Sequence, residues 1–218
     1  MAKKKATRFM VLAICGLIGV GFSLPGCHYS GEENKPITVI EPPEGIDPSD
    51  WTSVREDWQP MVEKISLWEN GEEQIIAPES SGYIDMGRIL ITTLHELDIQ
   101  AKCVFSGERI QEIKRNDKVV EIAFKQADDF PISQWIEEEE RSHILTNKNG
   151  YRILENVRTA IFVLEDTLDE GLGAHVLIDS EFEGEIAYSC WAVKQKGRED
   201  LDRSWVAEMG QIIKEANK

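Results

Sequence analysis

The sequence predicts an α+β domain with a mainly antiparallel sheet, built of hairpins, and two long amphipathic helices packed on it. Stretches of alternating apolar and polar residues recur through residues 62–194, and turn signals such as Asn70-Gly71 separate them. That pattern is typical of antiparallel strands joined by tight turns. In residues 83–98 and 200–216, apolar side chains instead recur every three or four positions. This spacing predicts helices that each bury one stripe against the sheet.

The chain begins with the features of an export signal. Three lysines and an arginine lie within residues 3–8, residues 9–24 are almost wholly apolar, and Leu24-Pro25-Gly26-Cys27 follows. This segment resembles a bacterial lipoprotein signal peptide, in which the cysteine after a Leu-x-small triplet becomes the lipidated first residue of the mature protein. The resemblance covers residues 1–27 and implies lipidation at Cys27. Pro25 departs from the small or aliphatic residue that the family prefers at that position.

The alternative for this segment is an uncleaved membrane helix. Residues 9–24 are fewer than the roughly 20 apolar residues that cross a bilayer, and three glycines weaken a helix there. The signal interpretation is therefore favoured. It implies an extracytoplasmic protein held by lipid chains on the cell membrane or the outer membrane.

The rest of the chain divides into a tether and one domain. Residues 28–48 combine prolines and glycines with acidic residues, a composition that suits neither a helix nor a sheet interior. We interpret them as a flexible tether. Residues 49–218 then form a single globular domain, a length that buries a sizeable core without disulfides.

The charge balance excludes one class of partner. The chain has 40 acidic and 24 basic residues, and four of the basic ones lie in the signal segment. Such an acid excess repels the phosphates of nucleic acids. The sequence therefore predicts no nucleic-acid binding, and it leaves two interpretations of the charge: solubility at a crowded surface, or attraction of cations and basic partners.

The first half of the domain is expected to start with a short helix over residues 50–59. Its tryptophans, Trp51 and Trp58, form either a flap packed on the core, which is favoured, or a sugar-stacking platform. A hairpin from Val62 to Ala77 follows, turning at Asn70-Gly71. A helix capped by Ser80 or Ser81 then runs through Asp98.

The middle of the domain is predicted from further alternation. We expect a strand at Ile99–Phe105 and a hairpin that pairs residues 110–115 with residues 118–125. Two aspartates and Pro131 then interrupt the pattern. The four glutamates within residues 133–145 favour a helix there.

The last strands are expected at four places, and a helix from Asp200 onward ends the chain. The strands cover residues 151–154, 159–165, 174–178 and 185–194. The apolar stripe of the final helix packs on the sheet or serves as a docking face.

Cys103 and Cys190 each belong to an alternating apolar stretch, so each side chain should point inward from a strand. In an exported protein such a pair forms a disulfide or remains as two buried thiols. The sequence leaves both open, because it does not place the two strands side by side.

Asp179, Glu181 and Glu183 provide the nearest approach to a metal motif. They alternate before Gly184, as the first ligands of a calcium loop do. The match fails at the twelfth position, where Cys190 replaces the required glutamate, so a solvated hairpin turn is favoured. If calcium or another cation binds, these three are the candidates, with acidic residues from 166–170 beside them.

No catalytic residues are predicted, since no nucleophile, phosphate-loop, zinc-protease or dinucleotide motif is present. The sequence therefore favours a lipid-anchored, non-enzymatic binding or interaction domain in the cell envelope, with an envelope protein as a candidate partner. One alternative is binding of a cation or small cationic solute by the acidic turns. A further alternative is a small hydrolase whose site no motif marks.

Overall fold

The computed structural model describes residues 57–166, 171–182, 185–194 and 200–216 of the chain. The signal segment and the tether lie outside these residues, as does Trp51. The described residues form a seven-stranded sheet with strand order β2-β1-β4-β5-β6-β7-β3. All six neighbouring strand pairs are antiparallel, so the expected α+β fold with an antiparallel sheet is confirmed.

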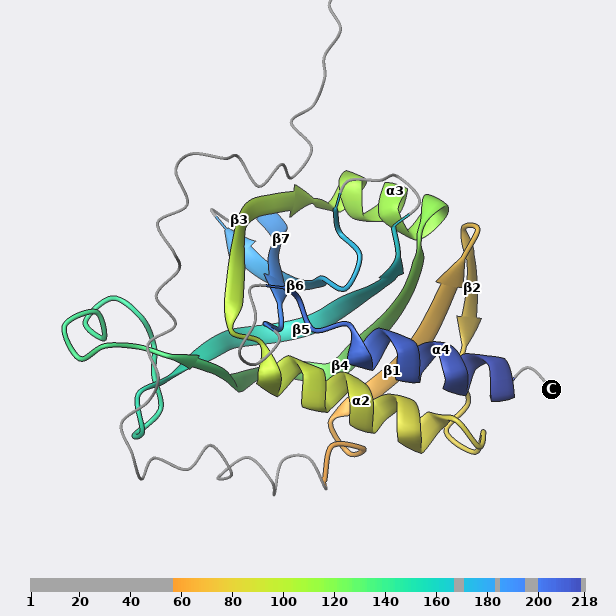
Figure 1. Cartoon of the computed structure of the whole chain (residues 1–218), viewed down its shortest axis with the longest axis horizontal. Helices are drawn as coiled ribbons and strands as arrows, with labels where there is room; N and C mark the ends of the chain where they lie inside the picture. The colour runs from red at the N-terminus through yellow and green to blue at the C-terminus, as the bar shows by residue number, and fades with distance from the viewer. Residues whose placement is uncertain (1–56, 167–170, 183–184, 195–199, 217–218) are drawn as a thin grey trace, which may run out of the picture.

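Ten helices and strands make up the described fold, and Figure 1 shows their arrangement. In chain order they are β1 (Val62–Glu69), β2 (Glu72–Ile75), α2 (Tyr83–Glu96), β3 (Ile99–Ser106), α3 (Gly107–Asn116), β4 (Lys118–Trp135), β5 (Tyr151–Glu165), β6 (Val176–Phe182), β7 (Glu185–Ala192) and α4 (Ser204–Ala216).

Helices α2 and α4 lie side by side on one face of the sheet (Figure 1). Their apolar stripes enter the larger of two hydrophobic clusters, where Leu90 and Leu94 of α2 and Met209 of α4 are fully buried. The helices have 14 and 13 residues. These are ordinary lengths for helices in globular proteins, so the expectation of two long helices is not confirmed.

Trp58 packs against α2 and is only 3% exposed. Its indole ring packs against the backbone of Gly87 in α2, and its ring centroid is 5.5 Å from that of Tyr83. A tryptophan buried in this way fills the core rather than presenting a platform. For Trp58, the packed-flap prediction is therefore confirmed.

Helix α3 lies on the opposite face of the sheet, and the strand predicted for residues 110–115 is wrong. Strand β3 pairs with β7 at one edge, whereas β4 lies in the middle of the sheet. The chain between β3 and β4 therefore crosses the face, and it does so as α3. Ser106 caps this helix by accepting a hydrogen bond from the N–H of Arg109, while Ile110 and Ile113 point into a second, smaller cluster.

Strands β4 and β5 form the longest pair, and the ends of both strands with the turns between them, residues 135–151, extend from the body as an arm (Figure 1). The helix predicted over residues 133–145 is wrong, because β4 continues to Trp135 and turns follow. Asp128 and Pro131 do not end the strand. They coincide with shifts in its pairing register.

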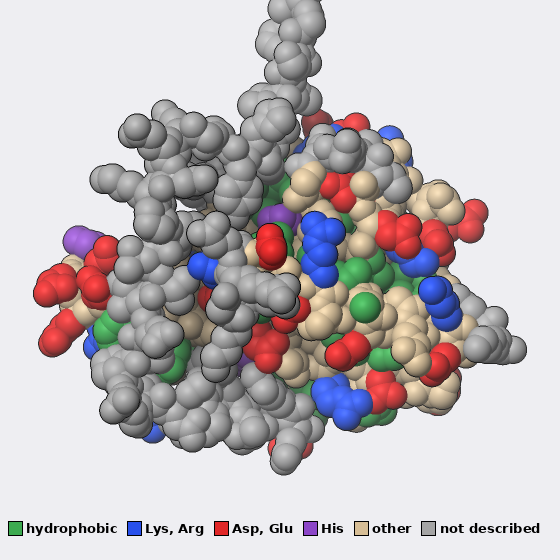
Figure 2. Space-filling view, in the orientation of Figure 1, with side chains coloured by type: hydrophobic (Ala, Val, Ile, Leu, Met, Phe, Trp, Pro, Cys, Tyr) green, Lys and Arg blue, Asp and Glu red, His purple; other side chains and the backbone are tan. Residues whose placement is uncertain are grey.

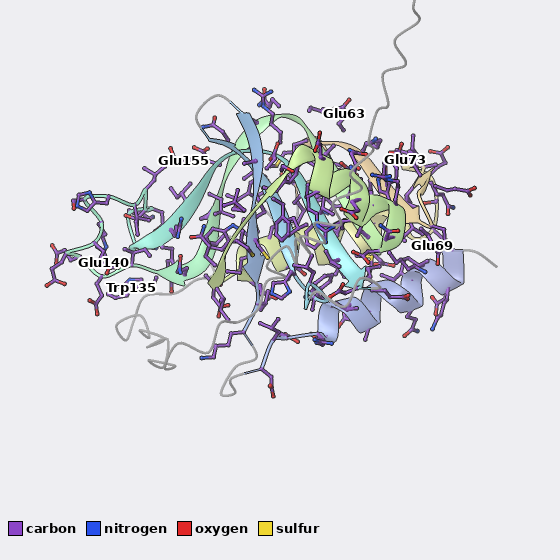
Figure 3. All side chains as sticks on the ribbon, turned by 90° about the horizontal axis from the view of Figure 1, so that it is seen from above. Glu63, Glu69, Glu73, Trp135, Glu140 and Glu155 are labelled. Atoms are coloured by element: carbon purple, nitrogen blue, oxygen red, sulfur yellow. The ribbon has the colours of Figure 1, made fainter. Side chains whose placement is uncertain are left out.

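The tip of the arm is acidic, and it lies far from the β1–β2 hairpin. Figure 2 shows acidic side chains gathered at this end, and three consecutive glutamates, residues 138–140, are exposed there. Figure 3 shows Trp135 and Glu140 on the arm and Glu69 and Glu73 at the opposite end of the molecule. The acidic side chains are thus distributed over both ends.

Two of the predicted hairpins, β1–β2 and β6–β7, are present, whereas the hairpin predicted to pair residues 110–115 with residues 118–125 is absent because α3 occupies residues 107–116. Asn70 and Gly71 connect β1 to β2 with φ angles of 53° and 79°, as the tight turn requires. Strands β6 and β7 pair from Val176–Trp191 to Phe182–Glu185. No helix within the described residues is long and apolar enough to span a membrane.

Candidate functional site

A buried ion pair lies between α3 and the sheet. The Nζ of Lys114 is 2.7 Å from Oε1 of Glu121, and the two side chains are 8% and 11% exposed. The other carboxylate oxygen of Glu121 accepts a hydrogen bond of 2.9 Å from Nε1 of Trp68. The Lys114 ammonium also lies over the Trp68 ring, 4.8 Å from its centroid. Both oxygens of Glu121 therefore have partners, as a buried carboxylate requires.

The strand register brings these residues together. In the β1–β4 pair, Ser66 lies opposite Glu121 and Trp68 lies opposite Val119. Side chains alternate between the two faces of a strand, so Ser66, Trp68 and Glu121 all point to the face that α3 crosses. We call this the α3 face. Lys114 reaches it from the helix above.

The polar network continues toward the β1–β2 hairpin. Glu73 of β2 accepts hydrogen bonds from Lys64, at 2.6 Å, and from Ser66, at 2.8 Å. The hydrogen bond from Lys64 lowers the pKa of Glu73, and that from Ser66 adds to the effect. Glu73 therefore stays ionised to lower pH than an isolated glutamate does.

A strip of the α3 face beside the helix remains partly exposed. It crosses five strands: Lys64 pairs with Ala123, Ala123 with Thr159, and Asp179 with Tyr188. The backbone N–H of Thr159 donates a hydrogen bond to Oδ1 of Asp179, which connects β5 to β6. Asp179 is buried, while the other four are half-buried. We call these five residues the open strip. Polar groups on a partly exposed sheet face are available to a ligand, whereas the apolar residues under α3 are not.

Asp179 joins β5 to β6 within the open strip. Its Oδ1 accepts hydrogen bonds of 2.8 Å from the backbone N–H groups of both Arg158 and Thr159. Burial raises the pKa of Asp179, and these two hydrogen bonds oppose the rise without cancelling it. The carboxyl group is thus fixed by backbone contacts in an environment that disfavours its charge.

Tyr188 lies across from Asp179 on β7. Burial, followed by the negative charges of Asp179 and Glu121, raises the pKa of Tyr188 to about 12. Both carboxylates therefore act on the same phenol group. The end of the strip around Tyr188 combines an aromatic ring with negative potential, which suits a positively charged group.

The acidic turn residues named from the sequence do not gather in the described structure. Asp179 binds two backbone N–H groups as above, and Oδ2 of Asp166 accepts a hydrogen bond of 2.7 Å from the N–H of Leu172. The Glu181 side chain and Glu183 lie outside the described part of the structure, as do residues 167–170. Within the described residues, no group of three or more His, Cys, Asp or Glu is arranged to hold a metal ion.

Cys103 and Cys190 come from adjacent strands. β3 pairs with β7 so that Ala101 lies opposite Cys190 and Val104 opposite Ser189, with an irregularity between them where Cys103 lies. Cys190 is buried in the smaller cluster and Cys103 packs against it. The structure holds no disulfide between these two described cysteines. The neighbouring strands provide the side-by-side placement that the sequence left open.

Sequence reasoning missed most of this site. Lys114 was assigned to a strand, and Trp68, Thr159 and Tyr188 had no motif to mark them. One signal was present: Glu121 is a lone carboxylate between Val120 and Ile122 in an otherwise apolar strand. A charged residue in such a strand needs a partner on its face of the sheet.

Comparisons with protein-family models, with curated proteins and with solved structures find no match to this chain. No relative therefore contributes a function to it. The chemistry of the α3 face and the patterns of the sequence are the grounds on which a function can be inferred.

Proposed function

We propose that this chain is a lipid-anchored, non-enzymatic binding domain of the bacterial cell envelope, whose ligand surface is the open strip. The single observation that supports the binding surface is that strand pairing and one hydrogen bond place Lys64, Ala123, Thr159, Asp179 and Tyr188 side by side on a partly exposed sheet face. The anchor rests on the signal features that end at Cys27. The absence of known catalytic motifs from the sequence supports a binding role.

The ligand carries a positively charged group. Two carboxylates, Asp179 and Glu121, lie close enough to Tyr188 for their charges to act on its phenol. Lys114 offsets the charge of Glu121, whereas Asp179 accepts hydrogen bonds from two uncharged backbone N–H groups. A cation beside Asp179 and the Tyr188 ring gains both Coulomb and cation–π attraction. The acid excess of the whole chain draws such ligands toward it.

The tether explains how such a domain meets its partner. Residues 28–48, fully extended, reach about 70 Å from the lipid at about 3.3 Å per residue. The open strip then faces solvent or a neighbouring envelope protein rather than the anionic headgroups of the bilayer, which would repel an acidic domain. A basic surface segment of an envelope protein is a partner that fits this chemistry.

Calcium binding at the acidic turns is the alternative with a simple test. The full chain is heated with and without millimolar calcium, because a ligand that binds only the folded state raises the melting temperature. A rise that disappears in a Glu181→Gln, Glu183→Gln variant supports the turns as a calcium site. An unchanged melting temperature rejects this alternative and leaves the open strip as the binding surface.

The open strip is tested with a small organic cation. The full chain, labelled with ¹⁵N and held in detergent, is titrated with putrescine and separately with a lysine tripeptide. We expect saturable shifts of the amide signals of Thr159, Asp179 and Tyr188. The control variant Asp85→Asn removes one acidic charge from α2, on the opposite face, and should bind equally well. Saturable shifts confined to other faces, or none at all, would contradict the proposal.

A further inference from the structure

Arg152 of β5 contacts side chains from three other strands. Its guanidinium carbon is 4.8 Å from the ring centroid of Trp191 in β7, which is itself 1% exposed. Its Nη1 donates hydrogen bonds of 3.1 Å to Oε1 of Gln100 in β3 and to Oε1 of Gln134 in β4. Residues from three neighbouring strands thus contact the guanidinium group of Arg152, which is half-buried.

Arg152 has no carboxylate partner among the described residues. Five other cations in this part of the chain, Lys64, Arg88, Arg109, Lys114 and Lys118, each form an ion pair with a carboxylate. Burial alone lowers the pKa of Arg152, with no acidic neighbour opposing the shift. Buried and half-buried charges in folded proteins are normally paired. The Arg152 guanidinium is instead held by the amide oxygens of two neutral glutamines, so its charge has no ionised partner among the described residues.

The hydrogen bonds to the two glutamines use only the Nη1 group of Arg152. Arginine has five N–H donors, and the two on Nη1 serve the glutamines. The Nε and Nη2 donors make no hydrogen bond to any residue that the structure describes. Two parallel N–H groups on one edge match the two oxygens of a carboxylate. The Trp191 ring, whose centroid lies 4.8 Å from the guanidinium carbon, limits its movement.

We propose that Arg152, with Gln100, Gln134 and Trp191, forms a binding site for a carboxylate group. This site is separate from the open strip, because Trp191 belongs to the cluster beneath α2 and α4 while Tyr188 and Cys190 of the same strand face α3. The carboxylate accepts two hydrogen bonds from the Nε–Nη2 edge. Its source is either a free small carboxylic acid or the end of a peptide chain.

The test observes the arginine and tryptophan side chains directly. The full chain, labelled with ¹⁵N, is titrated at constant ionic strength with acetate, and separately with N-acetyl-Ala-Ala, which carries a peptide carboxylate. We expect a saturable shift of the Arg152 Nε–H signal and of the Trp191 indole N–H signal. The amide N-acetyl-Ala-Ala-NH₂ lacks the charge and should produce neither. A shift with acetate as well as the peptide acid indicates any carboxylate, and a shift with the peptide acid alone indicates a chain terminus.

Two variants complete the experiment. Arg152→Lys keeps the positive charge but loses the two-donor edge, so the carboxylate-dependent shift of Trp191 should fall at least tenfold in apparent affinity. Arg158→Gln removes an exposed arginine from the same strand and should leave the shift unchanged. Unsaturable shifts, equal shifts with chloride, or equal affinity in Arg152→Lys would overturn the proposal. If Arg152→Lys does not fold, the wild-type titrations with the acid and its amide decide the question alone.

Discussion

Lys114 of α3 and Glu121 of β4 form an ion pair of 2.7 Å that is almost completely removed from solvent. The pair joins the crossing helix to the middle of the sheet, and Trp68 contacts both members. A buried pair is costly to break because the remaining charge has no partner. The position of α3 on its face of the sheet therefore depends on this contact.

Lys114→Met should destabilise the domain by about 3–5 kcal/mol, the range for losing one partner of a buried pair. The methionine keeps the apolar packing of the lysine stem but leaves the Glu121 carboxylate without its cation. Urea denaturation followed by circular dichroism measures the loss. Lys118→Met is the matched control, because its ion pair with Glu69 is far more exposed and exposed pairs contribute about 0–1 kcal/mol. Equal losses in the two variants would contradict this explanation.

Asp179 should make the domain less stable as the pH rises. Burial raises the folded-state pKa of Asp179 above its ordinary value of 3.8, so the folded state holds its proton more tightly than the unfolded state does. The contribution of Asp179 to stability is then full below pH 3.8 and is lost as the pH rises through the raised folded pKa. Asp179→Asn keeps an oxygen acceptor for the two backbone N–H groups and does not titrate.

The measurement for Asp179 is the difference in unfolding free energy between Asp179→Asn and the wild type, followed from pH 3.5 to pH 7. We expect Asp179→Asn to become more stable relative to the wild type as the pH rises. The difference should become constant once Asp179 is ionised in both the folded and the unfolded state. Other carboxylates titrate equally in both proteins and cancel. A constant difference, or one that moves in favour of the wild type, would contradict the raised pKa.

Gly87→Ala should destabilise the domain although alanine is the better helix former. The substitution gains about 1 kcal/mol of helix propensity. A Cβ at Gly87, however, would overlap the indole ring of Trp58, and overpacking a filled core costs about 1–3 kcal/mol. Because Trp58 is 3% exposed and also contacts Tyr83, the ring has little room to shift.

Gly210→Ala is the control for the Gly87 variant. Gly210 lies in α4, and a Cβ there would meet no atom within 4 Å. This variant should gain about 0.5–1 kcal/mol, the ordinary preference for alanine over glycine in a helix. Thermal denaturation of both variants gives the comparison. A gain in Gly87→Ala similar to that in Gly210→Ala would show that Trp58 does not pack as described.

The sequence predicts those elements whose determining residues all lie close together in the chain. Asn70-Gly71 predicted its hairpin because the turn requires positive φ at both positions. The sequence does not predict α3 because its apolar stripe has only two strongly apolar residues, Ile110 and Ile113, and because Asn116-Asp117 resembles a hairpin turn. The glutamates at 137–140 favoured a helix, but the pairing of β4 with β5 continued the strand to Trp135 instead.

The candidate site could not be predicted for a different reason. Lys64, Thr159 and Tyr188 are separated by long stretches of sequence and share a face only through the register of the strands between them. No local spacing contains that information. The sequence did single out Asp179, but as a turn ligand rather than as a strand residue that binds the backbone of β5.

The most direct test of the account is the state of Cys27 in the protein made by a bacterium that processes lipoproteins. The full chain is expressed with an alkyne-labelled fatty acid, and its amino terminus is analysed by mass spectrometry beside a Cys27→Ser control. We expect a wild-type chain that begins at Cys27 and carries acyl chains, and a control that takes up no label. A wild-type chain with Met1 intact and the Cys27 thiol unmodified would contradict it.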